Sequence, residues 1–421
     1  MPENSTPHTE DGNSFFGGPP RTKWCFEVGP IRPPSEGRDH SLLIRATRNC
    51  PWNRCLFCPV YKGQKFEYRK VAEIKEDIDA VKALEEELNK TSWRLGLGGR
   101  INNAVLNDFV LGNSRLYGRQ PGDSQEFSAR LNSLSNVANW MASGGRTVFL
   151  QDADTLIRRS PELAELLRHI KRSFPGVERI TSYARARTLA RKSLEELRLL
   201  HEAGLTRLHV GMESGCDEVL EYMQKGVTAT EIISGGQKAV TAGISLSEYI
   251  MPGLGGRRWS ERHAYESARV LNQVNPDFIR IRSLAVGRAL LLHEKLESGD
   301  FEPLDEDEVV GEIRLFVQNL DCRSYVASDQ MVNLLWEVEG QLPQDKQRML
   351  DVISSYLSKE ARDRLRFRLE RRRRSFFAVY GGLPAEVEDK VMRAEKSIES
   401  DSPEAAAKVE EAIAVLKQGF I

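Results

Sequence analysis

The chain has 421 residues, with 60 Lys and Arg against 61 Asp and Glu and a formal net charge of −1. This balance excludes a protein held on nucleic acid or an anionic membrane mainly by its overall charge. With 40% hydrophobic residues, the chain is too apolar to be a disordered, solvated polypeptide. Neither a long apolar run nor a secretory signal pattern is present, so we expect a cytoplasmic protein without a membrane span.

Residues 1–38 are rich in Pro, Gly, Ser and Asn, and we predict an irregular N-terminal arm there. From residue 39 to about 300, short aliphatic runs alternate with amphipathic stretches. Candidate strands begin near Leu42, Thr147, Arg179, Arg207, Leu246 and Phe278. From the second strand onward they follow one another at about 30 residues, which is what a strand, a loop and a crossover helix require. We therefore predict an α/β fold, a parallel sheet arranged as a partial (βα)6 TIM-like barrel over 39–300.

The interval after the first strand is much longer, with a charged helix at 71–89 and a Gly- and Asn-rich insertion at 91–146. Later intervals predict helices at 161–173, 193–203, 228–242 and 260–274. After residue 300 the strand pattern stops. Residues 301–421 are therefore predicted to be a helical C-terminal region, with helices at 305–320, 329–341, 344–374 and 386–417.

Three of the six cysteines, Cys50, Cys55 and Cys58, lie within nine positions directly after the first predicted strand. A tight group in a large chain indicates metal or redox chemistry rather than a disulfide framework. A structural zinc ion takes four protein ligands, and a [4Fe–4S] cluster usually takes four cysteines. Three local thiolates therefore leave one coordination position open for a substrate-like ligand.

Two alternatives stand beside this interpretation. Cys25 or His40 could supply a fourth ligand, which would make the site a closed structural zinc or electron-transfer centre. The three cysteines could also be unligated buried residues, although three in one turn-rich loop argue against this. Cys216 and Cys322 are most simply small buried side chains.

The segment from Cys50 to Cys58, CPWNRCLFC, resembles the signature loop of the radical S-adenosylmethionine (radical SAM) enzymes. That signature is usually CxxxCxxC, after the first strand of a partial (βα)6 barrel. Here the first gap has four residues, so the extra residue must bulge. The resemblance implies a [4Fe–4S] cluster on the three cysteines, S-adenosylmethionine (SAM) as the second cofactor, and Phe57 as the aromatic residue near the adenine.

Further segments resemble this family in order and location. Residues 149–154 stand where the family binds the amino group of SAM, which assigns that role to Gln151, Asp152 or Asp154. The GMESG segment at 211–215, followed by MQKG at 223–226, looks like the fourth-strand motif of the Elp3-like and coproporphyrinogen-dehydrogenase-like branch. In that branch the position of Glu213 or Ser214 reaches SAM.

Residues 251–256 resemble the fifth-strand glycine motif, which would bring Gly253 and Gly255 to the adenine. Each of these matches has a structural alternative: Asp154 as a helix cap, the glycines as turn residues, and Glu213 as a solvated strand end. Their common position at the carboxyl ends of successive strands favours a ligand site.

The resemblance implies reductive cleavage of SAM to a 5′-deoxyadenosyl radical that abstracts hydrogen from an unknown substrate, with flavodoxin or ferredoxin as electron donor. Arg280 and Arg282 alternate on the sixth strand and are candidates for a substrate carboxylate or phosphate. His209 and His263 could transfer protons, but a structural histidine is the simpler expectation. Anaerobic tetrapyrrole chemistry is a second candidate on resemblance alone. Outside enzymes, the alternative is a non-catalytic iron–sulfur or zinc protein for electron transfer or scaffolding.

One dense basic run lies in the C-terminal region. It could contact RNA or form a solvated helix face paired with Glu360, Asp363 and Glu370, and the second interpretation is favoured because a charge run alone is weak evidence. Its members are Arg362, Arg364, Arg366, Arg368, Arg371, Arg372, Arg373 and Arg374.

Overall fold

The computed structural model of the protein describes residues 24–34, 40–118, 124–398 and 402–418. The predicted N-terminal arm therefore lies mostly outside the described residues, and the predicted insertion is described apart from 119–123.

Within the described residues the main sheet has eight strands in the order β1-β4-β5-β6-β7-β8-β9-β10. Neighbouring strands from β1 to β9 are parallel, and β10 pairs antiparallel with β9. The strands are β1 (Leu42–Arg45), β4 (Thr147–Gln151), β5 (Arg179–Arg185), β6 (Leu205–Glu213), β7 (Ser245–Ile250), β8 (Phe278–Ile281), β9 (Tyr325–Ala327) and β10 (Gly340–Gln341). The strands predicted from sequence coincide with β1 and β4 to β8.

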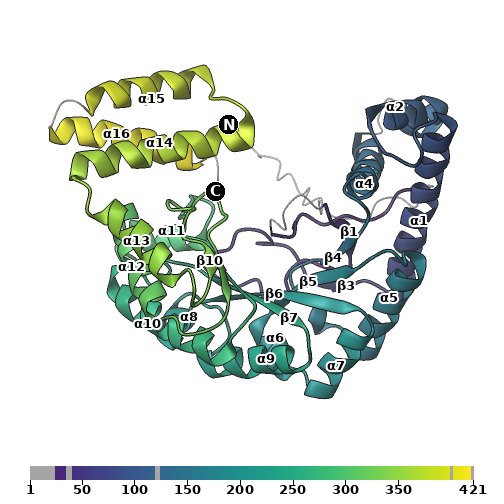
Figure 1. Ribbon diagram of the computed structural model, residues 1–421, viewed down its shortest axis with the longest axis horizontal. Helices are drawn as coiled ribbons and strands as arrows, with labels where there is room; N and C mark the ends of the chain where they lie inside the picture. The colour runs from purple at the N-terminus through teal and green to yellow at the C-terminus, as the bar shows by residue number, and fades with distance from the viewer. Residues whose placement is uncertain (1–23, 35–39, 119–123, 399–401, 419–421) are drawn as a thin grey trace, which may run out of the picture.

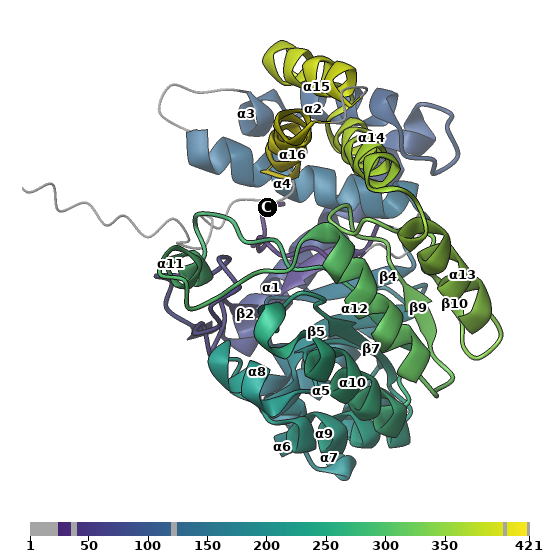
Figure 2. The same cartoon turned by 90° about the vertical axis from the view of Figure 1, so that its left-hand side faces the viewer.

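The predicted α/β fold, a partial barrel with a mostly parallel sheet, is thereby confirmed. Figure 1 shows the sheet curved, with α5, α7, α9, α10 and α12 along its outer side. Figure 2 shows α10, α12 and α13 following one another along one flank of the molecule.

The two faces of the sheet differ in chemistry because successive side chains of a strand point to opposite sides. One face packs in the main hydrophobic core through aliphatic residues such as Ile44, Leu150, Leu208, Leu246 and Ile279. The other face carries aromatic and charged residues, namely Phe149, Tyr183, His209, Tyr249 and Arg280. This inner face is therefore suited to a polar ligand rather than to a second hydrophobic layer.

The helices predicted between the strands are confirmed, and two of them begin with a capping box, Ser193 with Glu196 and Thr228 with Glu231. They are α5 (Ser160–Ser173), α7 (Leu194–Glu202), α9 (Ala229–Thr241) and α10 (Gly256–Val274). Three short elements were not predicted: η1 (Thr155–Ile157), α6 (Ala186–Arg191) and α8 (Asp217–Tyr222).

The long first interval is largely helical. The predicted charged helix is α1 (Val71–Arg94), and the insertion contains α2 (Asn103–Gly112), α3 (Ser114–Tyr117) and α4 (Ser124–Ala142). These helices share the main core through buried residues such as Leu84, Phe109 and Trp140. The Gly-rich segments of the insertion thus form turns between helices rather than one extended loop.

Helix α11 (Leu291–Glu297) precedes the C-terminal region. That region contains α12 (Glu306–Asn319), α13 (Lys346–Leu357), α14 (Ala361–Tyr380), α15 (Ala385–Ser397) and α16 (Pro403–Gln418). The predicted helix at 329–341 is wrong, because this stretch holds turns and β10 after strand β9. Asn333 fixes the stretch against β8: its Oδ1 accepts from Ser283 N (2.9 Å) and its Nδ2 donates to Ile281 O (2.7 Å). Tertiary hydrogen bonds here override a locally helical pattern.

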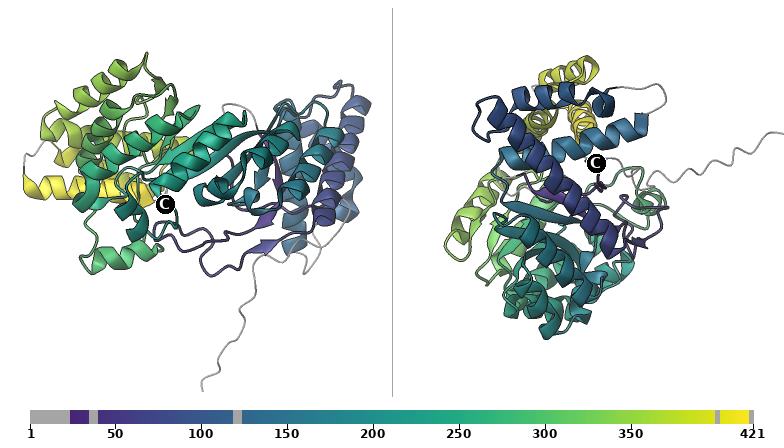
Figure 3. Two further views of the ribbon diagram at one scale, coloured as in Figure 1. Left: turned by 90° about the horizontal axis from the view of Figure 1, so that it is seen from below. Right: turned by 90° about the vertical axis from the view of Figure 1, so that its right-hand side faces the viewer.

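Helices α14, α15 and α16 have a small core of their own, which includes Leu369, Val391, Val409 and Ile413. Figure 1 and the left view of Figure 3 show these helices and helices α1–α4 at opposite ends of the sheet. None of the described helices is long and apolar enough to cross a membrane.

The arginines of the basic run are mostly paired with carboxylates. Arg368 lies 2.6 Å from Glu410, Arg371 lies 2.6 Å from Glu337, and Arg372 binds Glu306 of α12. Further pairs are Arg364–Asp307, Arg366–Asp363, Arg373–Glu395 and Arg374–Glu370. The run therefore joins α14 to its neighbours.

Candidate cofactor site

The cysteine loop, residues 49–66, lies at the carboxyl end of β1 between two short strands. These strands, β2 (Thr47–Arg48) and β3 (Glu67–Tyr68), pair antiparallel and bring the two ends of the loop together. Asn53, in the middle of the four-residue gap, has φ 49°, a left-handed conformation that asparagine tolerates. The extra residue expected to bulge is thus accommodated at this turn.

The turn at 223–226, after α8, holds the cysteine loop in place. Leu56 N–H donates to Met223 O (3.1 Å), and Trp52 Nε1–H donates to Gln224 O (2.6 Å). Gly226 has φ 69°, and a Cβ on it would lie 2.3 Å from the Trp52 ring. On the other side, Leu292 N–H donates to Leu56 O (3.1 Å). The loop between the cysteines is therefore fixed from two sides.

The three thiols are partly exposed and lie close enough to affect one another's ionisation. Burial raises the pKa of Cys55 and of Cys58, and the cation of Lys225 opposes this shift at both thiols. Among the described residues, no three His, Cys, Asp or Glu side chains converge on one metal ion. In a cubane cluster each thiolate binds a different iron, so such a cluster does not require the three donors to converge on one ion.

The two residues considered as a fourth ligand lie elsewhere. Cys25 lies between Trp24, whose ring contacts Phe109 of α2, and Phe26, whose N–H donates to Ser133 Oγ of α4, so Cys25 lies among the insertion helices. His40 precedes β1 and exchanges hydrogen bonds with the Ser143 hydroxyl, 3.1 Å from its N–H and 3.2 Å from its carbonyl. His40 is therefore at the amino end of β1, whereas the cysteine loop is at its carboxyl end.

An ion pair stands beside the loop. Glu213 ends β6 with φ 64°, and its Oε1 lies 3.0 Å from Lys225 Nζ. Lys225 Nζ is also 5.6 Å from the centre of the Phe57 ring. Burial disfavours the charged form of Lys225, but Glu213 and Cys55 outweigh it and raise its pKa. In the sequence Lys225 stands out only as part of the MQKG segment, and the basic residue in that segment is the signal that points to it.

The three candidates at the end of β4 are engaged within the protein. Gln151 accepts from Gly29 N (2.8 Å) and donates to Gly29 O (3.0 Å), which ties the 24–34 segment to the sheet. Asp152 is fully buried and accepts from Arg45 Nε (2.7 Å) and from Asn49 N (3.0 Å). It thus connects β1 with the start of the cysteine loop.

Asp154 accepts from Arg185 N (3.2 Å) and Thr188 Oγ1 (2.6 Å) at the start of α6. Burial raises its pKa to about 6. The structure thus gives Asp154 hydrogen bonds of the capping type, made to α6 rather than to the η1 helix that follows it.

Ser214 and the fifth-strand glycine segment are joined through His263. His263 is fully buried, and burial lowers its pKa to about 4, so the ring is neutral. Its Nε2–H donates to Met251 O (3.1 Å), which leaves Nδ1 to accept from the Ser214 hydroxyl (2.8 Å). Ser214 Oγ in turn accepts from Cys216 N (3.0 Å). This chain of hydrogen bonds locks the ends of β6 and β7 to α10.

The glycine segment is also fixed by Glu312 of α12, whose Oε1 accepts from Gly253 N (2.7 Å). Burial raises the pKa of Glu312 to about 7. Gly255 is closely surrounded, since a Cβ on it would lie 3.1 Å from the Trp259 backbone. The backbone of this segment is therefore held rigidly at the edge of the sheet.

The inner face beyond these residues carries the two predicted substrate arginines. Arg280 is paired with Asp329 (2.7 Å). Arg282 lies 4.4 Å over the Tyr249 ring and forms no ion pair with any described residue. Tyr249 and Tyr183 approach one another to 3.5 Å between their hydroxyl oxygens, and Tyr183 stacks edge-on against Phe149. His209 is fully buried among these rings.

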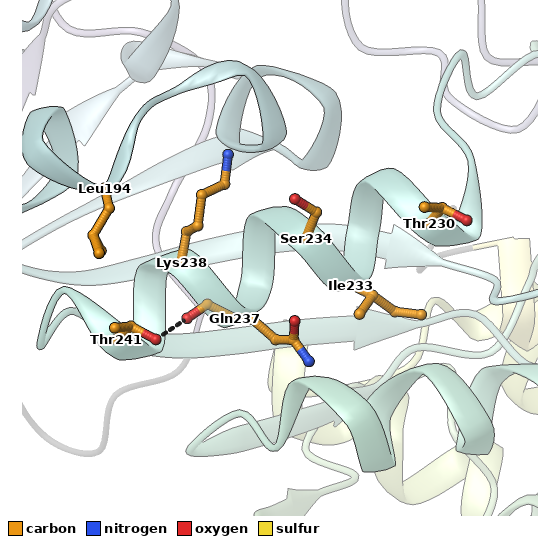
Figure 4. A pocket seen from close by; sticks show the side chains of 7 residues that line it. All are labelled: Leu194, Thr230, Ile233, Ser234, Gln237, Lys238 and Thr241. Carbon is orange, nitrogen blue, oxygen red and sulfur yellow. Dashed lines mark hydrogen bonds between the residues drawn. The ribbon is translucent and has the colours of Figure 1, made fainter.

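A pocket of about 390 Å³ lies on the outer surface between α7 and α9 (Figure 4). Its one cation, Lys238, already donates to Ala190 O (2.5 Å) and Lys192 O (2.6 Å). The pocket is separate from the cysteine loop and offers no group for the chemistry considered above.

Residues 122–268 match the family model described as the Radical SAM superfamily. The resemblance drawn from the motifs is thereby confirmed over this part of the chain, which carries a radical SAM domain of the kind found in enzymes. Enzymes of this superfamily use a [4Fe–4S] cluster and SAM. The matched residues do not include the cysteine loop.

Within this class, the chain is similar to the tRNA uridine(34) acetyltransferase of Methanocaldococcus jannaschii, with 24% identity over 117 residues, which cover 28% of this chain and 22% of that protein. The acetyltransferase of Methanocaldococcus infernus gives the same identity over 119 residues, with the same shares. The match thus spans roughly a fifth of the length of these curated relatives.

Among solved structures, the chain is similar to methylornithine synthase (PylB) with a TM-score of 0.39 and 14% identity, covering 76% of this chain and 71% of that chain. The Elp3 of Methanocaldococcus infernus gives 0.36 and 16%, covering 44% and 49%. Coproporphyrinogen III oxidase (HemN) from Escherichia coli gives 0.39 and 14%, covering 68% and 54%. Similarities at these TM-scores do not support a conclusion about this chain.

Proposed function

We propose that the chain binds a [4Fe–4S] cluster through Cys50, Cys55 and Cys58 and cleaves SAM reductively to abstract hydrogen from a substrate. The observation that carries the proposal is the loop itself: three partly exposed thiols, held from two sides at the carboxyl edge of a parallel sheet, beside an ion pair. When bound, the cluster and SAM supply the electron and the carbon radical. The protein supplies position, charge and exclusion of water.

The residues that would hold SAM surround the loop at the same edge of the sheet. The Lys225–Glu213 pair offers one cation and one carboxylate, which complement the carboxylate and ammonium groups of the methionine moiety. The rigid 251–256 backbone and Phe57 would enclose the adenine. Gln151, Asp154 and Ser214 would act mainly by fixing this frame, because their polar atoms already bind protein partners. Asp152 fixes it through Oδ2, whereas its buried Oδ1 has no hydrogen-bond partner among the described residues.

The substrate would bind on the inner face, next to Tyr183 and Tyr249. Arg282 is the candidate for an anionic substrate group, because it forms no close ion pair with a described carboxylate, whereas Arg280 is paired with Asp329. The tRNA substrate in the names of the relatives is not part of the proposal, since the match covers only a small part of those proteins. An external one-electron donor is required.

Anaerobic reconstitution with iron and sulfide tests this proposal. We expect about four irons per chain, a spectral change on adding SAM, and 5′-deoxyadenosine when dithionite is supplied. Substituting Ala for Cys50, Cys55 or Cys58 should abolish cluster binding, whereas Cys216→Ala and Cys322→Ala serve as matched controls and should retain it. A cluster that survives loss of one loop cysteine, or one equivalent of zinc bound by four side chains, contradicts the proposal and favours a scaffold or electron-transfer protein.

A further inference from the structure

A pocket of about 510 Å³ opens directly beside the cysteine loop. Its walls are Pro51 and Trp52 of the loop, residues of η1, and the residues in and around α6. Four cations line it against a single carboxylate, Glu196; the cations are Arg185, Arg187, Arg191 and Lys192. In a chain with a net charge of −1 this is a local excess of positive charge.

Of these four cations, Lys192 alone has a close ion pair among the described residues, with Glu196 at 3.3 Å. Arg191 is exposed and forms no ion pair within the described part of the chain. Arg187 is 36% exposed and lies 3.6 Å from Glu231, too far for a strong hydrogen bond. In the adjoining pocket, which shares Ile157, the cations Arg69, Arg158 and Arg159 are in ion pairs, and Lys70 is the one lining cation without an ion pair among the described residues. More of the lining cations are thus left without a close carboxylate beside the cysteine loop than in the adjoining pocket.

The pocket also lies close to a cysteine that is proposed to bind the cluster. Pro51 and Trp52 of its wall directly follow Cys50 in the chain, and consecutive Cα atoms are about 3.8 Å apart. The Trp52 ring has two guanidinium groups, of Arg54 and Arg185, at 5.0 Å from its centre. A partner seated here would therefore lie within a few residues of the cluster, on a surface that is both cationic and aromatic.

We propose that this pocket is the docking site of an acidic one-electron carrier protein that reduces the cluster. The inference rests on the proposed function and adds to it the surface on which the electron arrives. One electron leaves the reduced carrier and enters the cluster, and no bond forms or breaks. RNA is the less suitable occupant, because an RNA substrate must bring its reacting carbon to the inner face, whereas this pocket is walled by the loop, η1 and α6.

The test compares a protein donor with a small-molecule donor in the reconstituted holoenzyme. The double variant Arg187→Glu/Arg191→Glu reverses two charges on the pocket wall. We expect reduction of the cluster by reduced flavodoxin, followed by its absorbance at low ionic strength, to slow by about tenfold or more, because steering by opposite charges raises association rates by this order. Added salt should shrink the difference between variant and wild type. Reduction by dithionite should be unchanged.

A matched control reverses two charges with the same spacing on α5. Arg168 and Arg172 are exposed, four residues apart, and lie toward the end of α5 that precedes β5. Arg168→Glu/Arg172→Glu should leave both reductions unchanged. The single variant Arg191→Glu removes a side chain without an ion pair, so it should slow the flavodoxin reaction without disturbing the fold.

The outcomes separate this inference from the proposed function. Failure of wild type to form a three-cysteine cluster, or to make 5′-deoxyadenosine with dithionite, overturns the proposed function. If that function stands, the docking site is overturned when flavodoxin reduces the pocket variant as fast as wild type, when the α5 control slows equally, or when neither flavodoxin nor ferredoxin reduces wild type. Loss of affinity for total tRNA with unchanged flavodoxin reduction would assign the pocket to RNA instead.

Discussion

At the scale of single residues, buried carboxyl groups near the candidate site have more than one role. Asp152 is tied to Arg45 and to the first residue of the cysteine loop, whereas Asp154 caps α6 without a close cation. Both follow the carboxyl end of β4, as the sequence pattern predicts. The pattern does not distinguish their partners, because Arg45 and Thr188 are 107 and 34 residues away along the chain.

Asp154 gives a prediction about pH. Its folded pKa of about 6 lies above the ordinary 3.8, so the folded state holds this proton more tightly than the unfolded state. Its contribution to stability is therefore full below about pH 4 and is lost as the pH rises through about 6. Asp154→Asn keeps an acceptor for Arg185 N but carries no charge. We expect it to remove this part of the pH dependence, on the order of 3 kcal/mol, in urea unfolding between pH 4 and 8.

The control for this measurement is Asp108→Asn, which alters a partly exposed ion pair of α2 with Arg94. It should keep the wild-type dependence. Parallel stability curves for wild type and Asp154→Asn would show that the ionisation of Asp154 does not differ between the folded and unfolded states.

At the scale of elements, the parallel strands could be predicted because strands buried under helices read as aliphatic runs. Strand β9 was missed because it has three residues and lies in a stretch whose conformation depends on hydrogen bonds to β8. The cysteine loop could be recognised from its spacing. Its anchoring turn at 223–226 could not, since the Trp52–Gln224 contact spans 172 residues.

A single methyl group added at the 223–226 turn should disturb the cysteine loop. Gly226→Ala places a Cβ against the Trp52 ring in a left-handed backbone position, so we expect the loop to be displaced. Iron bound per chain after reconstitution should fall at least severalfold. Gly63→Ala is the matched control, because Gly63 has a similar φ of 74° but no atom within 4 Å of its added Cβ. Equal iron content in the two variants would show that the Trp52 contact does not position the cysteines.

At the scale of the whole molecule, the basic run of α14 connects the C-terminal helices to the barrel. Arg372 is 2% exposed and binds Glu306 of α12, with a further bond to Met331 O (3.1 Å). Arg374 is 71% exposed and lies 3.8 Å from Glu370 of its own helix. Composition alone could not tell these two arginines apart, because their difference arises only when α14 packs on α12.

Arg372→Gln should therefore lower the free energy of unfolding by about 3 kcal/mol, since it removes the closest cation from the buried carboxylate of Glu306 and leaves it only the longer pair with Lys417 at 3.5 Å. Arg374→Gln should change it by less than about 0.5 kcal/mol. Urea unfolding of both variants checks the difference, and limited proteolysis should cleave Arg372→Gln first near the start of α14. Similar stability for the two variants would mean that Arg372 does not fasten α14 to α12.

The backbone of Leu56 is bonded to residues 223 and 292, far downstream of the cysteines it separates. When only the first two hundred residues have been synthesised, Cys50, Cys55 and Cys58 are present. The segments around residues 223 and 292 that hydrogen-bond to Leu56 are not. Iron and sulfide supplied at that stage would encounter a cysteine loop that is not yet held in its folded conformation. On the proposed function, the folded loop that would receive a cluster is therefore complete only once synthesis has passed α11, so cofactor insertion should follow the synthesis of that helix.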